Sequence, residues 1–180
     1  MSINYFSKDV FKKLDLSYNP KSLYTIVKYR PEFYVDGKYI KNEWSSYNDI
    51  GIHFDDGILN REEYIRVENN YISCAKDLAR EAGCKYLTVA YIEPLNYIIT
   101  KKHDGSNVIL SCGNRLLLSD IDDILQQVIR ELSWVIFINN KKGFMLDFGY
   151  DMYMHVRCRL NKDVVVKITN QYNLFLDPRR

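Results

Sequence analysis

The chain has 180 residues and a mass of 21.3 kDa, which is the size of one ordinary domain. With 47% hydrophobic and 27% charged residues it is too apolar for a disordered chain, and no apolar run approaches the roughly 20 residues of a membrane-spanning helix. The net charge of +2 neither requires nor excludes nucleic acid as a partner. We therefore expect a single domain, residues 1–180, with no membrane partner.

The start of the chain, residues 1–11, has no apolar signal core and no small-residue cleavage site, so a cytoplasmic location is expected. The four cysteines contain no Cys-x-x-Cys pair, which argues against a zinc site or a disulfide framework. Four reduced, packed thiols are the expectation, with no metal and no cofactor. The oligomeric state is left open.

A short helix is predicted near residues 8–14, and the clearest helix of the chain is predicted over residues 60–82. Asn60 is its expected N-cap, Glu63 is placed for a capping-box exchange, and Gly83 suits the end. Glu62 and Arg66 have the spacing of a supportive ion pair. The apolar residues of the segment fall on one face, which must therefore pack against a core.

Glu68 is the exception on that apolar face, because its position on the helix places a carboxylate among apolar residues. A buried carboxylate needs a hydrogen-bond or ion-pair partner. A structural anchor that joins the helix to the sheet is the favoured interpretation of Glu68. A catalytic acid or base is the alternative.

A second helix is predicted from Ser119, as its cap, to about Leu132, because apolar residues recur there at helical spacing. Asp120, Asp122 and Asp123 crowd its first turn, where carboxylates complement the helix dipole. A local stabilising role for these three residues is therefore one interpretation.

Segments rich in Tyr, Val and Ile predict nine strands, at residues 22–29, 86–92, 96–100, 107–112, 134–138, 144–148, 150–160, 163–169 and 172–176. Short polar links at 103–106, 139–143 and 161–163 indicate antiparallel neighbours. The predicted class is α+β, a mainly antiparallel sheet with two principal helices packed against it.

The predicted strand at 150–160 alternates strictly in sequence. Its polar side carries Tyr153, His155, Arg157 and Arg159, with Asp151 at the head. Guanidinium groups beside an aromatic ring suit phosphate contacts and base stacking. A nucleic-acid-binding or other macromolecule-binding strand, 151–159, is therefore one alternative function, although nucleic acid is not the favoured partner.

No catalytic signature is present. The sequence lacks a Gly-x-Ser-x-Gly elbow, a His-Glu-x-x-His motif and a glycine-rich phosphate loop. The three histidines, His53, His103 and His155, lie in no recognisable local motif. We expect that the chain is not an enzyme, and an enzyme of unrecognised type using Glu68 with His155 or His53 remains the third alternative.

Two stretches resemble a pattern in bacterial immunity proteins of contact-dependent growth inhibition and related polymorphic toxin systems. The first stretch comprises Trp44, Asp49-Ile50-Gly51, Glu63-Tyr64-Ile65-Arg66-Val67-Glu68 and Tyr71-Ile72. The second is Phe148-Gly149-Tyr150-Asp151-Met152-Tyr153-Met154. Together they cover under a quarter of the chain.

The resemblance implies a non-enzymatic cytoplasmic protein that binds a cognate toxin domain and neutralises it, often by covering the toxin's active site. Fifteen tyrosines offer interface anchors. If the toxin is basic, the expected footprint is carboxylate-rich, and Tyr153 is added as an aromatic anchor. The expected toxin-binding residues are Asp55, Asp56, Glu62, Glu63, Asp120, Asp122, Asp123 and Tyr153. The net charge of +2 departs from the strongly acidic inhibitor that a basic nuclease would demand.

Overall fold

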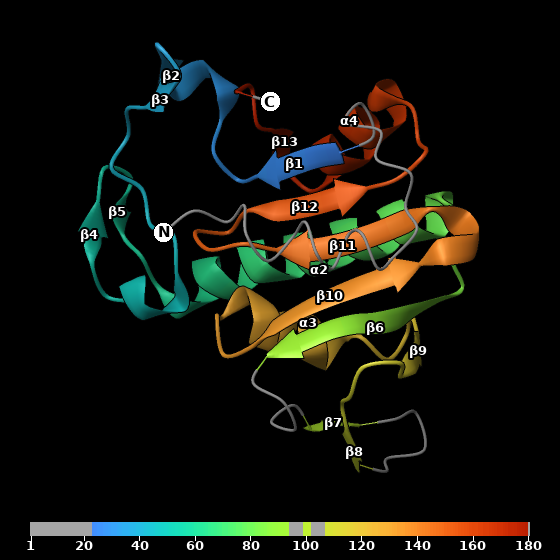
Figure 1. Ribbon diagram of the computed structural model, residues 1–180. Coiled ribbons are helices and arrows are strands. Elements are labelled where there is room, and N and C mark those ends of the chain that lie inside the picture. Colours follow the sequence, from blue (N-terminus) through green and yellow to red (C-terminus); the bar gives the residue numbers. More distant parts are fainter. Residues whose placement is uncertain (1–22, 94–98, 102–106, 180) are drawn as a thin grey trace.

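A seven-stranded antiparallel sheet organises the chain (Figure 1). The computed structural model describes residues 23–93, 99–101 and 107–179. The strand order across the sheet is β13-β1-β12-β11-β10-β6-β9. The strands are β1 (Leu23–Val27), β6 (Tyr86–Glu93), β9 (Arg115–Leu117), β10 (Trp134–Asn139), β11 (Phe144–Phe148), β12 (Met154–Arg157) and β13 (Phe175–Leu176). The predicted α+β class with a mainly antiparallel sheet is confirmed.

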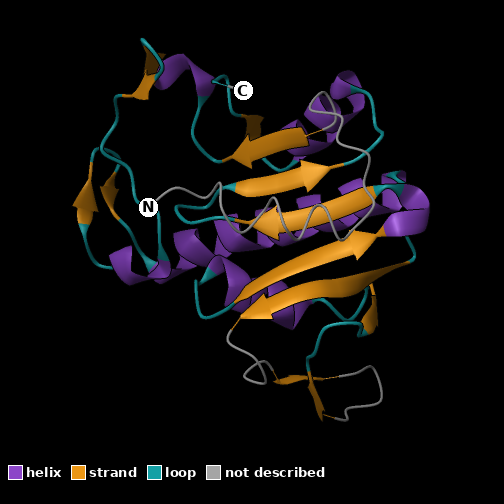
Figure 2. Cartoon of the chain, in the orientation of Figure 1, coloured by secondary structure: helices purple, strands orange, loops and turns teal. Residues whose placement is uncertain are grey.

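Three helices, α2 (Arg61–Glu81), α3 (Asp122–Ile129) and α4 (Lys162–Gln171), pack on one face of this sheet (Figure 2). Both α3 and α4 contact α2, which crosses behind the strands. The main apolar core lies between this helical layer and the sheet, and it includes Tyr64, Leu78 and Phe137. On the other face of the sheet, Ile136, Ile138 and Met145 form a smaller buried cluster.

Helix α2 confirms the predicted helix at 60–82. The Asn60 side chain accepts a hydrogen bond from the Glu63 backbone N–H at 2.8 Å, and Gly83 follows the helix with a φ of 79°. The reciprocal half of the predicted capping box is absent among the contacts of the described residues. The Glu63 carboxylate instead binds Arg66 at 2.6 Å, and this i,i+3 pair also replaces the predicted Glu62–Arg66 pair.

Helix α3 is shorter than the predicted segment at 119–132. Its N-cap position is Ile121, without a side-chain cap, while the Ser119 hydroxyl donates to the Asp120 carboxylate. Ile124 and Val128 are buried, as the helical spacing predicts. The helix ends before Glu131, whose φ is 59°, and Leu132 is therefore left 66% exposed.

The strand predicted at 163–169 is wrong, because this segment forms helix α4. Three consecutive valines, 164–166, favour a strand by local propensity. The buried residues Val165 and Thr169 are four positions apart, which is the spacing of one helical face. Packing of that face against α2 overrides the valine propensity. The 161–163 link is accordingly the start of a helix and not a hairpin.

The continuous strand predicted at 150–160 is also wrong in its extent. Asp151 and Met152 have φ values of 58° and 59°, and they form the turn that reverses the chain between β11 and β12. Antiparallel pairing of these two strands needs such a turn, for which the predicted strands leave no room. The alternation holds within β12, except that Arg157 is 4% exposed and therefore not on an open polar face.

The other predicted strands have mixed outcomes. Those at 22–29, 86–92, 134–138 and 144–148 are confirmed to within two residues at each end, and the one at 172–176 shortens to β13. A separate hairpin pairs β7 (Ile99–Lys101) with β8 (Asn107–Ile109), as predicted, although their connection lies outside the described residues. The helix predicted at 8–14 also lies outside them.

Two small hairpins and two 3₁₀ turns lie between β1 and α2. The hairpins are β2 (Tyr34–Val35) with β3 (Lys38–Tyr39), and β4 (His53–Phe54) with β5 (Gly57–Ile58). The turns are η2 (Pro31–Phe33) and η3 (Tyr47–Asp49), and a third, η4 (Asn140–Lys142), joins β10 to β11. Among the described residues, no helix is both long and apolar enough to cross a membrane.

Candidate functional site

Glu68 is completely buried and binds Arg130 through both carboxylate oxygens. Arg130 Nε lies 2.6 Å from Oε1, and Nη2 lies 2.7 Å from Oε2. The predicted burial and the predicted partner are both confirmed. Because Arg130 is the C-cap residue of α3, the anchor joins two helices rather than a helix and the sheet.

The two stretches that carry the family resemblance contact each other in the fold. Trp44 packs on Tyr64 with ring centroids 5.5 Å apart. Tyr71 packs on Phe148 at 6.2 Å, and its hydroxyl donates to the Met152 carbonyl at 2.6 Å. These residues therefore connect the segment before α2, the helix itself and the β11–β12 turn, which gives the pattern an architectural role.

The acidic residues of the expected footprint lie in two separate places. Asp55 and Asp56 are in the β4–β5 turn, close in sequence to Glu62 and Glu63 at the start of α2. The other three aspartates lie at the start of α3, where Asp122 pairs with Lys76. Lys76 is 13 residues beyond Glu63, and a rise of 1.5 Å per residue puts about 20 Å of helix between the two groups.

Several of these carboxylates already have partners within the chain. Asp56 pairs with Lys41, Glu63 with Arg66, and Asp122 with Lys76. Asp55 accepts a hydrogen bond from the Asn42 backbone N–H at 2.9 Å. Glu62 and Asp123 form no ion pair within the described ranges. The footprint is therefore less charged than its sequence suggests.

The basic strand of the alternative prediction does not present its side chains in one row. Tyr153 accepts a hydrogen bond from Arg179 Nη2 at 2.8 Å and packs 5.8 Å from the Tyr29 ring. Arg157 is buried, while Arg159 lies beyond the end of β12 and is exposed. Of the two arginines, Arg159 is therefore the one that is accessible to a large ligand.

A polar row crosses the face of the sheet opposite the described helices α2, α3 and α4. Thr25, His155 and Asp147 are register partners on β1, β12 and β11, and the Thr25 hydroxyl lies 3.1 Å from His155 Nδ1. Trp134 Nε1 donates to Asp147 at 2.6 Å. Burial raises the pKa of Asp147 to about 6, against the opposing hydrogen bonds from Trp134 and the Phe148 backbone. Glu68 faces the helical layer, so this row and Glu68 lie on opposite sides of the sheet.

A hollow lies where the small hairpins meet α2, and we call it the hairpin hollow. Its volume is about 570 Å³, within the range of ligand and peptide pockets. Residues from both hairpins, the first turns of α2 and the segment after α4 line it. Its wall carries aromatic rings, including Phe33, Tyr39, Trp44 and Phe54.

The charged groups around the hairpin hollow are paired. Lys28, buried in its wall, binds Glu43, and its Nζ lies 4.0 Å from the Trp44 ring centroid. Burial lowers the pKa of Lys28, while Glu43 opposes that shift. The second Glu43 oxygen accepts a hydrogen bond from the Tyr39 hydroxyl. These contacts hold both the β2–β3 hairpin and β1 around the hollow.

Apolar side chains are exposed on the two hairpins and beside them. Val35, Ile40, Ile52 and Ile58 are 50%, 61%, 49% and 65% exposed. The hairpins are tied together, because the Asp55 N–H donates to the Asn42 carbonyl at 3.0 Å. We call residues 31–59 the hairpin arm.

Within the hairpin arm the sequence singles out Trp44, Asp49-Ile50-Gly51, Asp55 and Asp56, but neither hairpin is among the predicted elements. One signal for a hairpin is nevertheless readable. Asp36-Gly37 is a two-residue turn sequence, and both residues have positive φ, 48° and 75°. The second hairpin turns through Asp55-Asp56, and Gly57, the first residue of β5, has a φ of 111°. The hollow itself has no such signal, since its lining comes from segments far apart in the chain.

Comparisons with known proteins add no relative: a scan against family models, a search of curated proteins and a search of solved structures found no match. In residues 23–93, 99–101 and 107–179, no group of three or more His, Cys, Asp or Glu side chains is arranged to hold a metal ion.

Proposed function

We propose that this chain is a cytoplasmic immunity protein that binds a cognate bacterial toxin domain and neutralises it by covering the toxin's active site. The observation that carries the proposal is the hairpin arm, whose exposed apolar side chains stand beside a hollow of about 570 Å³. Apolar groups rimmed by charge and placed next to a concave surface are typical of protein interfaces.

The charge of this region indicates the kind of surface that it fits. Residues 31–63 contain eight carboxylates and only three lysines or arginines. Asp36 and Glu62 form no ion pair with any residue that the structure describes, so their charge is available to a partner. We therefore place the toxin on the hairpin arm and the start of α2, with a basic surface opposite Asp55 and Glu62. The aspartates at the start of α3 lie outside this footprint.

The buried ion pair supports binding over catalysis by Glu68. Both oxygens of that carboxylate accept hydrogen bonds from Arg130, and the side chain has no exposed surface. A general acid or base must reach a substrate proton, directly or through one water molecule. Glu68 instead stabilises the packing of α2 and α3, on which the hairpin arm rests through Trp44 and Tyr64.

The test is protection of growth. The toxin domain encoded beside this chain in its source genome is expressed in a bacterial host with the wild-type chain, with Ile58→Asp, or with Leu117→Asp. Leu117 is the matched control, because it is 55% exposed on β9, at the far edge of the sheet. We expect the wild type and Leu117→Asp to restore growth, and Ile58→Asp to lose both protection and binding while its Tm is unchanged.

Two results would contradict the proposal. Failure of the wild-type chain to protect against this toxin would reject the immunity function. Full protection by Ile58→Asp and by Ile40→Asp would reject the hairpin arm as the contact surface.

A further inference from the structure

A second hollow lies at the opposite end of α2 from the hairpin arm, and we call it the basic hollow. It has a volume of about 340 Å³ and is lined by the end of α2, the β10–β11 turn and the residues after β12. Its lining consists of Glu81, Ala82, Lys141, Lys142, Arg159 and Leu160. Three cationic side chains thus face one carboxylate.

The three cations of the basic hollow have no carboxylate partner in the described part of the chain. Elsewhere on the surface Lys41, Arg66, Lys76 and Arg80 each form an ion pair, while Lys38 and Arg61 form none with a described residue. The basic hollow is distinguished because it gathers three such cations in one place. The carboxyl end of α2 attracts one cation through the helix dipole, which accounts for a single lysine at this place. It does not account for Arg159 and a second lysine.

Two glycines allow the cations to come this close to the backbone. A Cβ on Gly83 would lie 3.1 Å from Lys142 Nζ, and a Cβ on Gly143 would lie 2.9 Å from Arg159 Nε. The β10–β11 turn, which carries Lys141 and Lys142, is held in place by Asn139. Asn139 Oδ1 accepts a hydrogen bond from the Lys142 N–H at 3.2 Å, and its Nδ2 donates to the Tyr86 carbonyl at 2.9 Å. The cations therefore sit on a fixed backbone.

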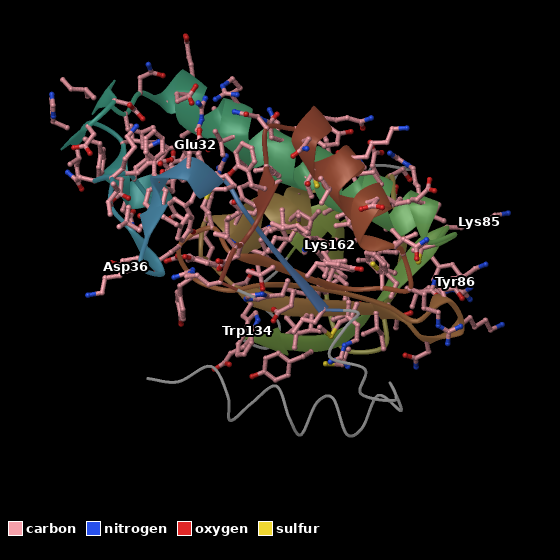
Figure 3. All side chains as sticks on the ribbon, turned by 90° about the horizontal axis from the view of Figure 1, so that it is seen from above. Glu32, Asp36, Lys85, Tyr86, Trp134 and Lys162 are labelled. Atoms are coloured by element: carbon pink, nitrogen blue, oxygen red, sulfur yellow. The ribbon has the colours of Figure 1, made fainter. Side chains whose placement is uncertain are left out.

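The basic surface extends beyond the hollow along the start of β6. Figure 3 shows Lys85 and Tyr86 at the same end of the molecule as the end of α2. Arg115 stacks over the Tyr86 ring with Cζ 3.2 Å from its centroid. Lys85 and Arg115 also form no ion pair with a described residue. The electrostatic field around the carboxyl end of α2 is therefore positive, whereas the field around residues 31–63 is negative.

We propose that the basic hollow binds a compact multivalent phosphate. A guanidinium recognises phosphate oxygens in pairs, and lysine ammonium groups add point charges around it. A multivalent anion also relieves the repulsion among three like charges. The hollow admits a group of a few phosphates, which come either from a free polyphosphate or from the backbone of a nucleic acid.

The experiment measures binding of tripolyphosphate to the full chain by isothermal titration calorimetry at low salt. The variants are Lys142→Ala and Arg159→Ala, and the controls are Lys38→Ala and Arg61→Ala, both exposed and both remote from the hollow. We expect each hollow variant to weaken binding about tenfold, as for the loss of a charge-assisted contact, and the controls to stay within about twofold.

A parallel titration with a single-stranded oligonucleotide distinguishes the two sources of phosphate. Oligonucleotide binding that is tighter than tripolyphosphate binding, falls with salt and needs Lys142 and Arg159 assigns the hollow to nucleic acid. Tighter tripolyphosphate binding assigns it to a free polyphosphate. Absence of binding by both probes overturns the proposal, and so does an equal loss of affinity in hollow and control variants. The Tm of each variant confirms that the fold is intact.

Discussion

Removal of the Glu68 carboxylate tests the central contact between α2 and α3. Glu68 has no exposed surface, whereas the Arg130 side chain is 26% exposed. Breaking a buried ion pair costs about 3–5 kcal/mol when the remaining charge has no other partner. In Glu68→Ala, Arg130 can turn toward water, so the lower end, about 3 kcal/mol, applies. For a chain of this size, this cost lowers the Tm by about 6–12 °C.

The reverse substitution, Arg130→Met, is expected to cost more. It leaves the carboxylate of Glu68 in a place with no exposed surface and no cation, so the upper end of the range, about 5 kcal/mol, applies. The double variant Glu68→Leu/Arg130→Met removes both charges, and its cost is expected to be smaller than that of Arg130→Met alone. Urea unfolding followed by circular dichroism at pH 7 gives the three free energies.

Glu62→Ala is the matched control, because Glu62 lies on the exposed side of the same helix. Its free energy of unfolding should change by no more than about 0.5 kcal/mol. Equal Tm values for Glu68→Ala and Glu62→Ala would refute the reasoning, and so would strictly additive costs in the double variant.

Three further predictions concern Asp147, Tyr71 and Cys112. Burial raises the pKa of Asp147 to about 6, so the folded chain holds this proton more tightly than the unfolded chain. Stability should therefore fall by about 2 kcal/mol as the pH rises from 4 to 7. Urea unfolding of Asp147→Asn should lack this pH dependence, and an unchanged dependence would contradict the assignment. Tyr71→Phe removes the hydrogen bond to the Met152 carbonyl and should lower the free energy of unfolding by about 1–3 kcal/mol. The exposed control Tyr150→Phe should leave it unchanged. Equal melting curves for the two variants would contradict a stabilising role for the Tyr71 hydroxyl. Cys112 is exposed, and the other three cysteines are buried. A thiol reagent should therefore modify one cysteine rapidly in the folded chain and all four in urea. Cys112→Ser should abolish the rapid modification.

The sequence predicts α2 well because independent signals agree there. Asn60 caps the helix, apolar residues recur on one face, and Gly83 adopts the positive φ that ends it. Glu68 is predictable for the same reason, since its place on the wheel requires burial and a partner. The identity of that partner is not predictable, because Arg130 is 62 residues away and meets Glu68 only when α3 packs on α2.

The errors arise where local propensity and tertiary packing disagree. Val164, Val165 and Val166 favour a strand locally, but their segment has a helical face to bury against α2. At Asp151 and Met152 the alternating pattern is real, yet the chain must reverse there so that β12 can pair with β11. Two aromatic hydroxyl groups stabilise this turn, since Tyr29 donates to the Asp151 carbonyl and Tyr71 to that of Met152.

The position of α2 explains why the two proposed surfaces can be altered separately. The hairpin arm lies at its amino end and the basic hollow at its carboxyl end, with the Glu68–Arg130 pair and the apolar core between them. Its 21 residues span about 30 Å. This is several times the screening length of about 8 Å for exposed charges at physiological ionic strength. Substitutions at Ile58 and at Arg159 should therefore have additive effects on stability. Loss of toxin protection at the first and loss of phosphate binding at the second should occur independently, and dependence of one on the other would show that a partner contacts both ends of the helix.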